Sequence, residues 1–117
     1  MIKDLKTEIW VSALIKRAEI GGASAFIVHK GDRDVGSALV KIATLDANAR
    51  LIAPSRDLEG NLIWVDLTPT IIKADNSQSS DKQIDQYMQK RLLQDRDLWL
   101  VEIEDKLGRD FMIEKIE

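Results

Sequence analysis

The chain of 117 residues contains no cysteine, two prolines and one histidine. The absence of cysteine excludes disulfides, thiolate metal sites and cysteine nucleophiles, and it fits a reducing compartment. No apolar run approaches membrane-spanning length, and residues 1–6 alternate charged with apolar residues where a signal peptide would need an unbroken apolar core. These absences predict a cytoplasmic protein that does not associate with membranes.

The chain also lacks an excess of positive charge. Lysine and arginine total 17 against 20 for aspartate and glutamate, so the net charge of −3 offers no positive field to gather phosphates. Apolar residues make up 44% and charged residues 32%, a balance typical of soluble globular domains. We therefore expect a single globular domain over residues 1–117 that does not bind nucleic acid.

Periodicity predicts an alternation of helices and strands. Apolar residues at three- and four-residue steps predict a helix over residues 6–20, ended by Gly21-Gly22, and a second helix over residues 80–94, begun by a capping box of Ser80 and Gln83. Strands are expected over residues 25–28, 38–42, 50–53, 62–65, 98–104 and 111–116. The short connections favour an antiparallel meander. The predicted fold class is α+β, a largely antiparallel sheet of five to six strands with two helices packed on one face, in the order α-β-β-β-β-α-β-β.

A polar turn bounded by Gly31 and Gly36 is expected to join the first two strands as a hairpin. Its glycine spacing matches a phosphate-binding P-loop, but Ser37 stands where lysine is required and a strand follows instead of a helix. Asp32 begins a partial calcium-loop pattern, which Ala43 breaks at the position of the bidentate glutamate. We interpret Gly31, Asp32 and Gly36 as structural, with the glycines adopting conformations that are costly for other residues.

The densest acidic segment of the chain surrounds its penultimate strand. Strand period two places Glu102 and Glu104 on one face, while Trp99, Val101 and Ile103 point to the other face. The candidate functional cluster in this segment is Asp97, Glu102, Glu104, Asp105 and Lys106. Two carboxylates on one face can share a hard cation if a neighbouring aspartate completes the oxygen shell, and the Glu-x-Lys spacing is that of one nuclease superfamily. The alternative is a solvated face whose acids pair with lysine or arginine of adjacent strands.

Aromatic residues are few, at 5% of the chain, and the single histidine has no partner assigned by spacing. Trp10, Trp64 and Trp99 lie on apolar-periodic segments, so they are expected in the core, with a ligand-stacking wall as the alternative. His29 is expected at the end of a strand, at or near solvent.

Three motifs together resemble a family of small alphaproteobacterial proteins catalogued only as a domain of unknown function. They are the segments Trp10 to Arg17, Gly31 to Ala38 and Asp95 to Asp105. Arg96 stands where the family pattern has proline, and Val35 stands where it has alanine. The resemblance covers most of the chain, and it implies a stand-alone bacterial cytoplasmic protein with no assigned reaction.

Two hypotheses of function follow. The first is a non-catalytic accessory module that binds a protein or a small metabolite, because no complete catalytic constellation is present. It needs no cofactor and no metal, and a homodimer is one form that it can take. The alternative is a divalent-metal hydrolase or nuclease that uses Glu102 and Glu104. Whether the chain is an enzyme stays open, with more weight on the non-catalytic hypothesis.

Overall fold

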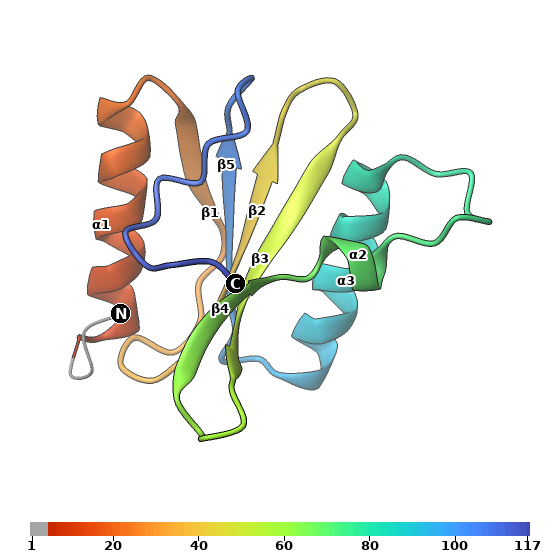
Figure 1. The fold of residues 1–117 in the computed structure, drawn as a ribbon. Helices are drawn as coiled ribbons and strands as arrows, with labels where there is room; N and C mark the ends of the chain where they lie inside the picture. Colours follow the sequence, from red (N-terminus) through yellow and green to blue (C-terminus); the bar gives the residue numbers. More distant parts are fainter. Residues whose placement is uncertain (1–4) are drawn as a thin grey trace.

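The computed structural model describes residues 5–117 of the chain. Its elements follow the order α1 (Thr7–Ile20), β1 (Ser24–His29), β2 (Ala38–Ala43), β3 (Ala49–Arg56), β4 (Leu62–Asp66), α2 (Thr68–Ile71), α3 (Ser80–Gln94) and β5 (Trp99–Glu104) (Figure 1). Most of residues 1–6, which served to exclude a signal peptide, lie outside the described residues. Among residues 5–117, no helix combines the length and the apolar character needed to cross a membrane.

The five strands form one sheet in the order β1-β5-β2-β3-β4. Three neighbouring pairs are antiparallel, and only β2 and β5 run parallel. The predicted α+β class with a largely antiparallel sheet is therefore confirmed, and β2, β3 and β4 form the predicted meander. The predicted hairpin of β1 with β2 is wrong, because β5 inserts between these two strands.

The two long helices cover opposite faces of the sheet, so the prediction that both pack on one face is wrong (Figure 1). On one face, Trp10, Val11 and Leu14 of α1 join a buried cluster with alternate residues of β2 and β5. On the other face, Ile84 and Met88 of α3 join a second cluster. Every residue of β2 is buried, and a strand that is apolar on both faces needs cover on both faces.

The C-terminal segment differs from the predicted sixth strand. Residues 111–116 contain only an isolated bridge, between Ile116 and Trp64 of β4, because Phe111 adopts a φ of 60° that interrupts an extended chain. The Glu117 N–H donates to the Trp64 carbonyl over 2.7 Å. The segment therefore packs over the α1 face of the sheet, where Phe111, Met112 and Ile116 join the core beside α1, and it meets β4 only near its end.

Candidate functional site

A row of side chains crosses the α3 face of the sheet at matching positions in four strands. The register pairs Phe26 of β1 with Glu102 of β5, Glu102 with Lys41 of β2, and Lys41 with Leu51 of β3. Side chains at paired positions point to the same face. The sheet topology therefore places Glu102 directly beside a lysine that is distant in the sequence.

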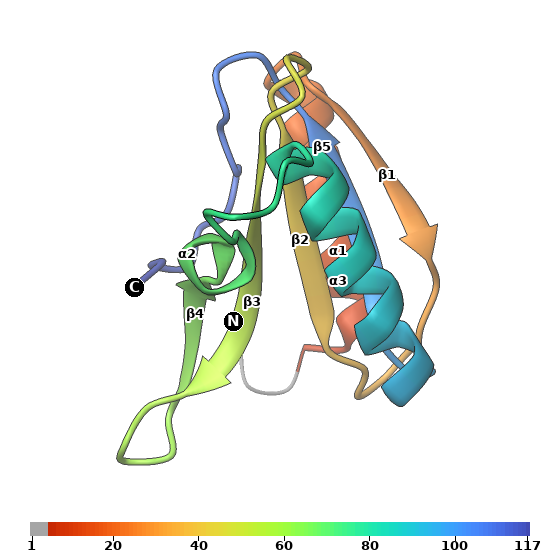
Figure 2. The ribbon, with the colours of Figure 1, turned by 90° about the vertical axis from the view of Figure 1, so that its right-hand side faces the viewer.

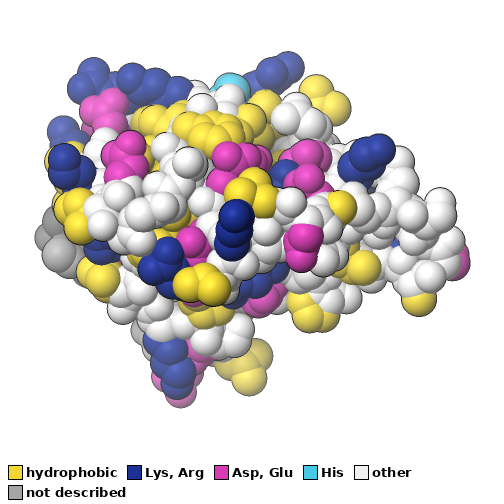
Figure 3. Space-filling view, turned by 90° about the horizontal axis from the view of Figure 1, so that it is seen from above, with side chains coloured by type: hydrophobic (Ala, Val, Ile, Leu, Met, Phe, Trp, Pro, Cys, Tyr) yellow, Lys and Arg dark blue, Asp and Glu magenta, His cyan; other side chains and the backbone are white. Residues whose placement is uncertain are grey.

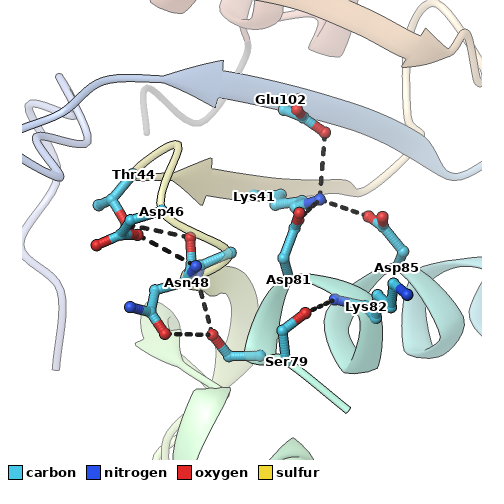
Figure 4. Close-up of polar contacts among 11 residues, drawn as sticks. Lys41, Thr44, Asp46, Asn48, Ser79, Asp81, Lys82, Asp85 and Glu102 are labelled. Atoms are coloured by element: carbon cyan, nitrogen blue, oxygen red, sulfur yellow. Dashed lines mark hydrogen bonds and ion pairs between the residues drawn. The ribbon is translucent and has the colours of Figure 1, made fainter.

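The Lys41 ammonium is the centre of a buried ionic cluster. Its side chain is only 3% exposed, and it contacts three carboxylates, those of Asp81, Asp85 and Glu102. The Nζ atom donates to Asp85 Oδ1 over 2.6 Å and lies 3.5 Å from Glu102 Oε1. Figure 4 shows Asp81 and Asp85 reaching the ammonium from α3, opposite Glu102. We call these four residues the Lys41 cluster.

The first turn of α3 is fixed against the β2–β3 turn, and this contact sets the position of the aspartates. Ser79 is the N-cap of α3, because its hydroxyl accepts a hydrogen bond from the Lys82 N–H over 3.3 Å. The neighbouring Ser80 does not fill the predicted capping role; its hydroxyl accepts from the Ala49 N–H over 2.9 Å. The Asp81 N–H donates to the Ala47 carbonyl over 3.3 Å. The helix N-terminus also favours the negative charge of Asp81.

Burial and charge act in opposite directions on the two most buried members of the Lys41 cluster. Burial by itself lowers the pKa of Lys41, but hydrogen bonds to Asp81 and Asp85 outweigh it, and the net pKa is raised. Burial raises the pKa of Glu102, and the adjacent Glu104 carboxylate adds to this effect, while Lys41 opposes it. Lys41 therefore stays charged at neutral pH, and Glu102 depends on it as a countercharge.

The structure separates the other members of the sequence-predicted cluster. Glu102 and Glu104 share the α3 face of β5 as expected, but Asp97 precedes this strand and Asp105 follows it, so these two aspartates lie at opposite ends. Asp105 instead binds Arg109 through two side-chain hydrogen bonds of 2.8 and 3.0 Å. Among residues 5–117, no group of three or more histidine, cysteine or acidic side chains is placed to hold a metal ion.

Asp105 and Lys106 are the remaining members of the cluster predicted from the sequence. The Arg109 guanidinium and backbone N–H beside Asp105 lower its pKa to about 2, so this buried carboxylate is committed to a structural ion pair. Lys106 is exposed in the turn that follows β5. Neither residue is directed at Glu102 by a contact in the described part of the chain. Asp105 is thus neither a solvated acid nor part of a shared metal site: it is buried and paired with Arg109, while Lys106 is exposed.

Sequence reasoning missed Lys41, although the sequence carries a signal. It is the only charged residue in the otherwise apolar run from Ala38 to Ala43. A lysine in a strand that is apolar at consecutive positions must either break the strand or find buried partners. Which carboxylates serve as those partners depends on the packing of α3 and β5, and no spacing in the sequence encodes it.

The glycine-bounded loop packs closely against the start of β5, and this packing differs from the conformational role that we expected of its glycines. Neither Gly31 nor Gly36 has a positive φ, so the expected conformational role is wrong. A Cβ atom at either position would collide with the Asp97 backbone, which the loop approaches closely. The Asp32 carbonyl accepts from Trp99 Nε1 over 2.6 Å, and the Asp32 N–H donates to the Asp97 carbonyl over 2.9 Å. These contacts attach the loop to the start of β5.

The remaining aromatic and histidine predictions concern the core and its border. All three tryptophans are at most 3% exposed, as expected of core residues. Trp10 and Trp64 also stack, with ring centroids 4.8 Å apart and an interplanar angle of 8°. His29 is half-buried at the end of β1, where its Nδ1 atom lies 2.9 Å from the Leu98 carbonyl oxygen.

The outer side of β1 is open, whereas β4, at the other end of the sheet, has one bridge to the C-terminal segment. No strand of the described residues pairs with the outer side of β1. Three consecutive side chains, those of Phe26, Ile27 and Val28, are 43%, 42% and 46% exposed. The helix α3 packs on β2 and β3 and leaves this border of the sheet uncovered (Figure 2). Apolar side chains gather beside acidic ones on the face shown in Figure 3. We call Phe26, Ile27 and Val28 with the open strand edge the β1 surface.

These features define a small α+β protein with a mixed sheet, a buried lysine cluster and an open strand edge at β1. The chain belongs to the family described as "Protein of unknown function (DUF1491)", whose model matches residues 5–113. The resemblance seen in the three sequence motifs is therefore confirmed. A comparison with curated proteins found no match.

Solved structures agree with this assignment. The chain is similar to the crystal structure of a DUF1491 family protein from Caulobacter crescentus CB15, with 37% identity, a TM-score of 0.80, and coverage of 97% of this chain and 99% of that one. An NMR structure of a DUF1491 family protein from the same organism gives 36% identity, a TM-score of 0.80 and 97% coverage of both chains. Protein Atu0922 from A. tumefaciens, at 22% identity and a TM-score of 0.68 over 96% of this chain and 97% of that one, shares the fold.

Proposed function

We propose that this protein is a non-catalytic interaction module that binds another protein chain by adding a strand to β1, and that a second copy of the same chain is this partner. The observation that carries the proposal is the exposure of Phe26, Ile27 and Val28 on an unpaired strand edge. An edge of this kind is a template for another strand, and proteins usually blunt it with charge, proline or a cover. The C-terminal segment bridges to β4 at Trp64, whereas β1 has no such contact on its outer side among the described residues and carries no charged residue between Ser24 and Val28.

A second copy suits the surface because an antiparallel strand pairs with itself around a two-fold axis. The residues of β1 that continue a regular ladder are Ser24 to Ile27, since the register shifts between Ile27 and His29. Around a two-fold axis within this segment, the exposed Phe26 and Ile27 side chains of one copy would lie against those of the other. Pairing would bury apolar area on both faces of β1 and extend the sheet across the dimer.

Light scattering coupled to size exclusion tests the proposal over a range of protein concentrations. We expect a concentration-dependent dimer for the wild type and a monomer for Ile27→Lys, because a lysine on the edge opposes strand addition. Leu58→Lys is the matched control, since Leu58 is fully exposed in the turn between β3 and β4. Its dimerisation should equal that of the wild type.

Cross-linking identifies which residues of the two copies lie next to each other, whereas light scattering gives only the molecular mass. The chain has no cysteine, so single substitutions Ala25→Cys, Phe26→Cys and Ile27→Cys have no background thiol. Oxidation should link copies through the position nearest the two-fold axis, whereas Leu58→Cys should not link. A wild type that stays monomeric at every concentration, or Ile27→Lys that dimerises normally, would contradict the proposal.

The hydrolase hypothesis has less support from the geometry. It required the acidic side chains near β5 to converge, but Glu102 contacts Lys41 and Asp105 contacts Arg109. Calorimetric titration with magnesium, manganese and calcium is the direct test. A tight site that Glu102→Gln or Glu104→Gln abolishes would favour the hydrolase over the interaction module.

A further inference from the structure

A pocket of about 280 Å³ lies on the α1 face of the sheet, on a different part of the molecule from the β1 surface. Three parts of the chain enclose it: the start of α1, the loop that precedes β2, and the paired ends of β3 and β4. Ligand pockets in proteins commonly have volumes of about 300–1,000 Å³. This pocket therefore matches the smallest ligands, of about one ring in size.

Strand register builds one wall of the pocket. Pro54 pairs with Trp64, and Arg56 pairs with Leu62, so these four side chains project from β3 and β4 to the same face. Trp64 in turn stacks on Trp10 of α1. Because the two indole rings cover each other and each tryptophan is only 3% exposed, they present little surface to the pocket. The half-buried Pro54 and Leu62 supply more of this apolar wall, and the exposed Arg56 lies beside them.

The polar groups of the pocket leave one positive charge without a counterion. Arg56 donates to the Gly60 carbonyl over 3.2 Å, and no carboxylate of the described residues forms an ion pair with it. The only acidic residue of the lining, Asp34, forms an ion pair of 3.5 Å with Lys6. The exposed Ser37 adds a hydroxyl at the same pocket.

A second donor belongs to the aromatic wall. The Nε1 atom of Trp64 is buried, and no acceptor among the described residues binds it. The other two indoles have acceptors, since Trp10 Nε1 donates to Glu114 and Trp99 Nε1 donates to the Asp32 carbonyl. Buried donors are rarely left unpaired in folded proteins. The Trp64 Nε1 atom is itself inaccessible, so the unpaired cation beside an apolar wall is the feature that favours a ligand, one that brings negative charge.

We propose that this pocket binds a small organic acid with one planar ring, whose carboxylate is held by Arg56 and Ser37 and whose ring lies against Pro54, Leu62 and the accessible margin of the two stacked tryptophans. Guanidinium groups bind carboxylates through charge-assisted hydrogen bonds in a fixed planar geometry. The ring gains dispersion contacts with these apolar side chains. An uncharged ligand of the same shape keeps the ring contacts and loses the charge.

The test is an NMR titration with benzoate as the probe and benzamide as its uncharged match. The three tryptophans give three indole N–H signals, of which Trp64 reports the pocket and Trp99 is an internal control. Benzoate should shift the Trp64 signal saturably and leave the Trp99 signal in place. Benzamide should bind about tenfold more weakly, because the charged hydrogen bonds are missing.

Variants separate the roles of charge and shape. Arg56→Gln should weaken benzoate binding to the level of benzamide, whereas Arg96→Gln, at an exposed arginine outside the pocket, should not change it. Leu62→Trp should fill the pocket and abolish binding of both probes, and an unchanged Trp99 signal will show that the fold persists. The proposal is overturned if benzoate gives no saturable shift at millimolar concentration, or if Arg56→Gln binds it as tightly as the wild type.

Discussion

Replacing Lys41 by methionine removes the only cation of the Lys41 cluster while keeping most of the side-chain volume. Three carboxylates, those of Asp81, Asp85 and Glu102, then lose the ammonium that they contact. Asp81 and Asp85 are 38% and 56% exposed, so water can replace the lost contact. Glu102 is 16% exposed and has Glu104 as a like-charged neighbour. The cost of the substitution therefore falls mainly on Glu102.

The expected magnitude follows from this difference in exposure. Removing one partner of a fully buried ion pair costs about 3–5 kcal/mol, whereas an exposed pair contributes about 0–1 kcal/mol. Only Lys41 and Glu102 approach full burial here, and their atoms are 3.5 Å apart. We expect Lys41→Met to lower the free energy of unfolding by about 2–3 kcal/mol at pH 7.

The pH dependence of this loss has a defined sign. The pKa of Glu102 in the folded state is already raised, mainly by burial, and losing Lys41 raises it further. An acid with a raised pKa in the folded state binds its proton more tightly there than in the unfolded chain, so protonation stabilises the fold. The loss caused by Lys41→Met should therefore shrink as the pH falls from 7 through the raised pKa of Glu102.

Urea denaturation of Lys41→Met and of the wild type at pH 7 and at pH 5 measures the loss in the free energy of unfolding and its change with pH. Adding Glu102→Gln should recover a large part of the loss at pH 7, because the double variant buries no unpaired charge. Lys82→Met is the matched control, because Lys82 is exposed in the first turn of α3, next to Asp81. This substitution should change stability little. A loss of less than about 1 kcal/mol, or a loss that is equal at the two pH values, would refute the reasoning.

Three further predictions concern the structural residues of the fold. Trp99→Ala should lower the free energy of unfolding by about 3–5 kcal/mol, because the side chain is 1% exposed; an unchanged denaturant midpoint would contradict this. Gly31→Ala should destabilise far more than Asp32→Ala, because its Cβ atom meets the Asp97 backbone, and equal thermal midpoints would argue against a close approach. Asp105→Asn should lower stability at pH 7. It should also remove the wild-type loss of stability that we expect as the pH falls from the ordinary pKa of 3.8 to the lowered value of about 2, and acid titrations of unfolding check this difference.

The sequence by itself determined the local elements and the family. Apolar periodicity predicted α1 and α3 nearly to the residue, and alternation with turn residues located the five strands of the sheet, because both signals depend on neighbours within a few positions. The same signals missed the short helix α2 and predicted a strand over residues 111–116 that does not form. Strand period two also predicted correctly that Trp99 and Glu102 point to opposite faces of the sheet. The family motifs were recognisable for the same reason, since they are contiguous.

Only the tertiary structure decided the strand order, the helix faces and the partners of the charged residues. Short-range spacing in the sequence carries no information on the pairing of β1 with β5, because β5 begins 70 residues after His29. That insertion leaves β1 at the border and brings Glu102 beside Lys41. The clue in the sequence was the run of apolar residues around Lys41, which needs cover on both faces of the sheet. Which helix supplies the cover, and which carboxylates meet the lysine, depends on long-range packing that no short segment encodes.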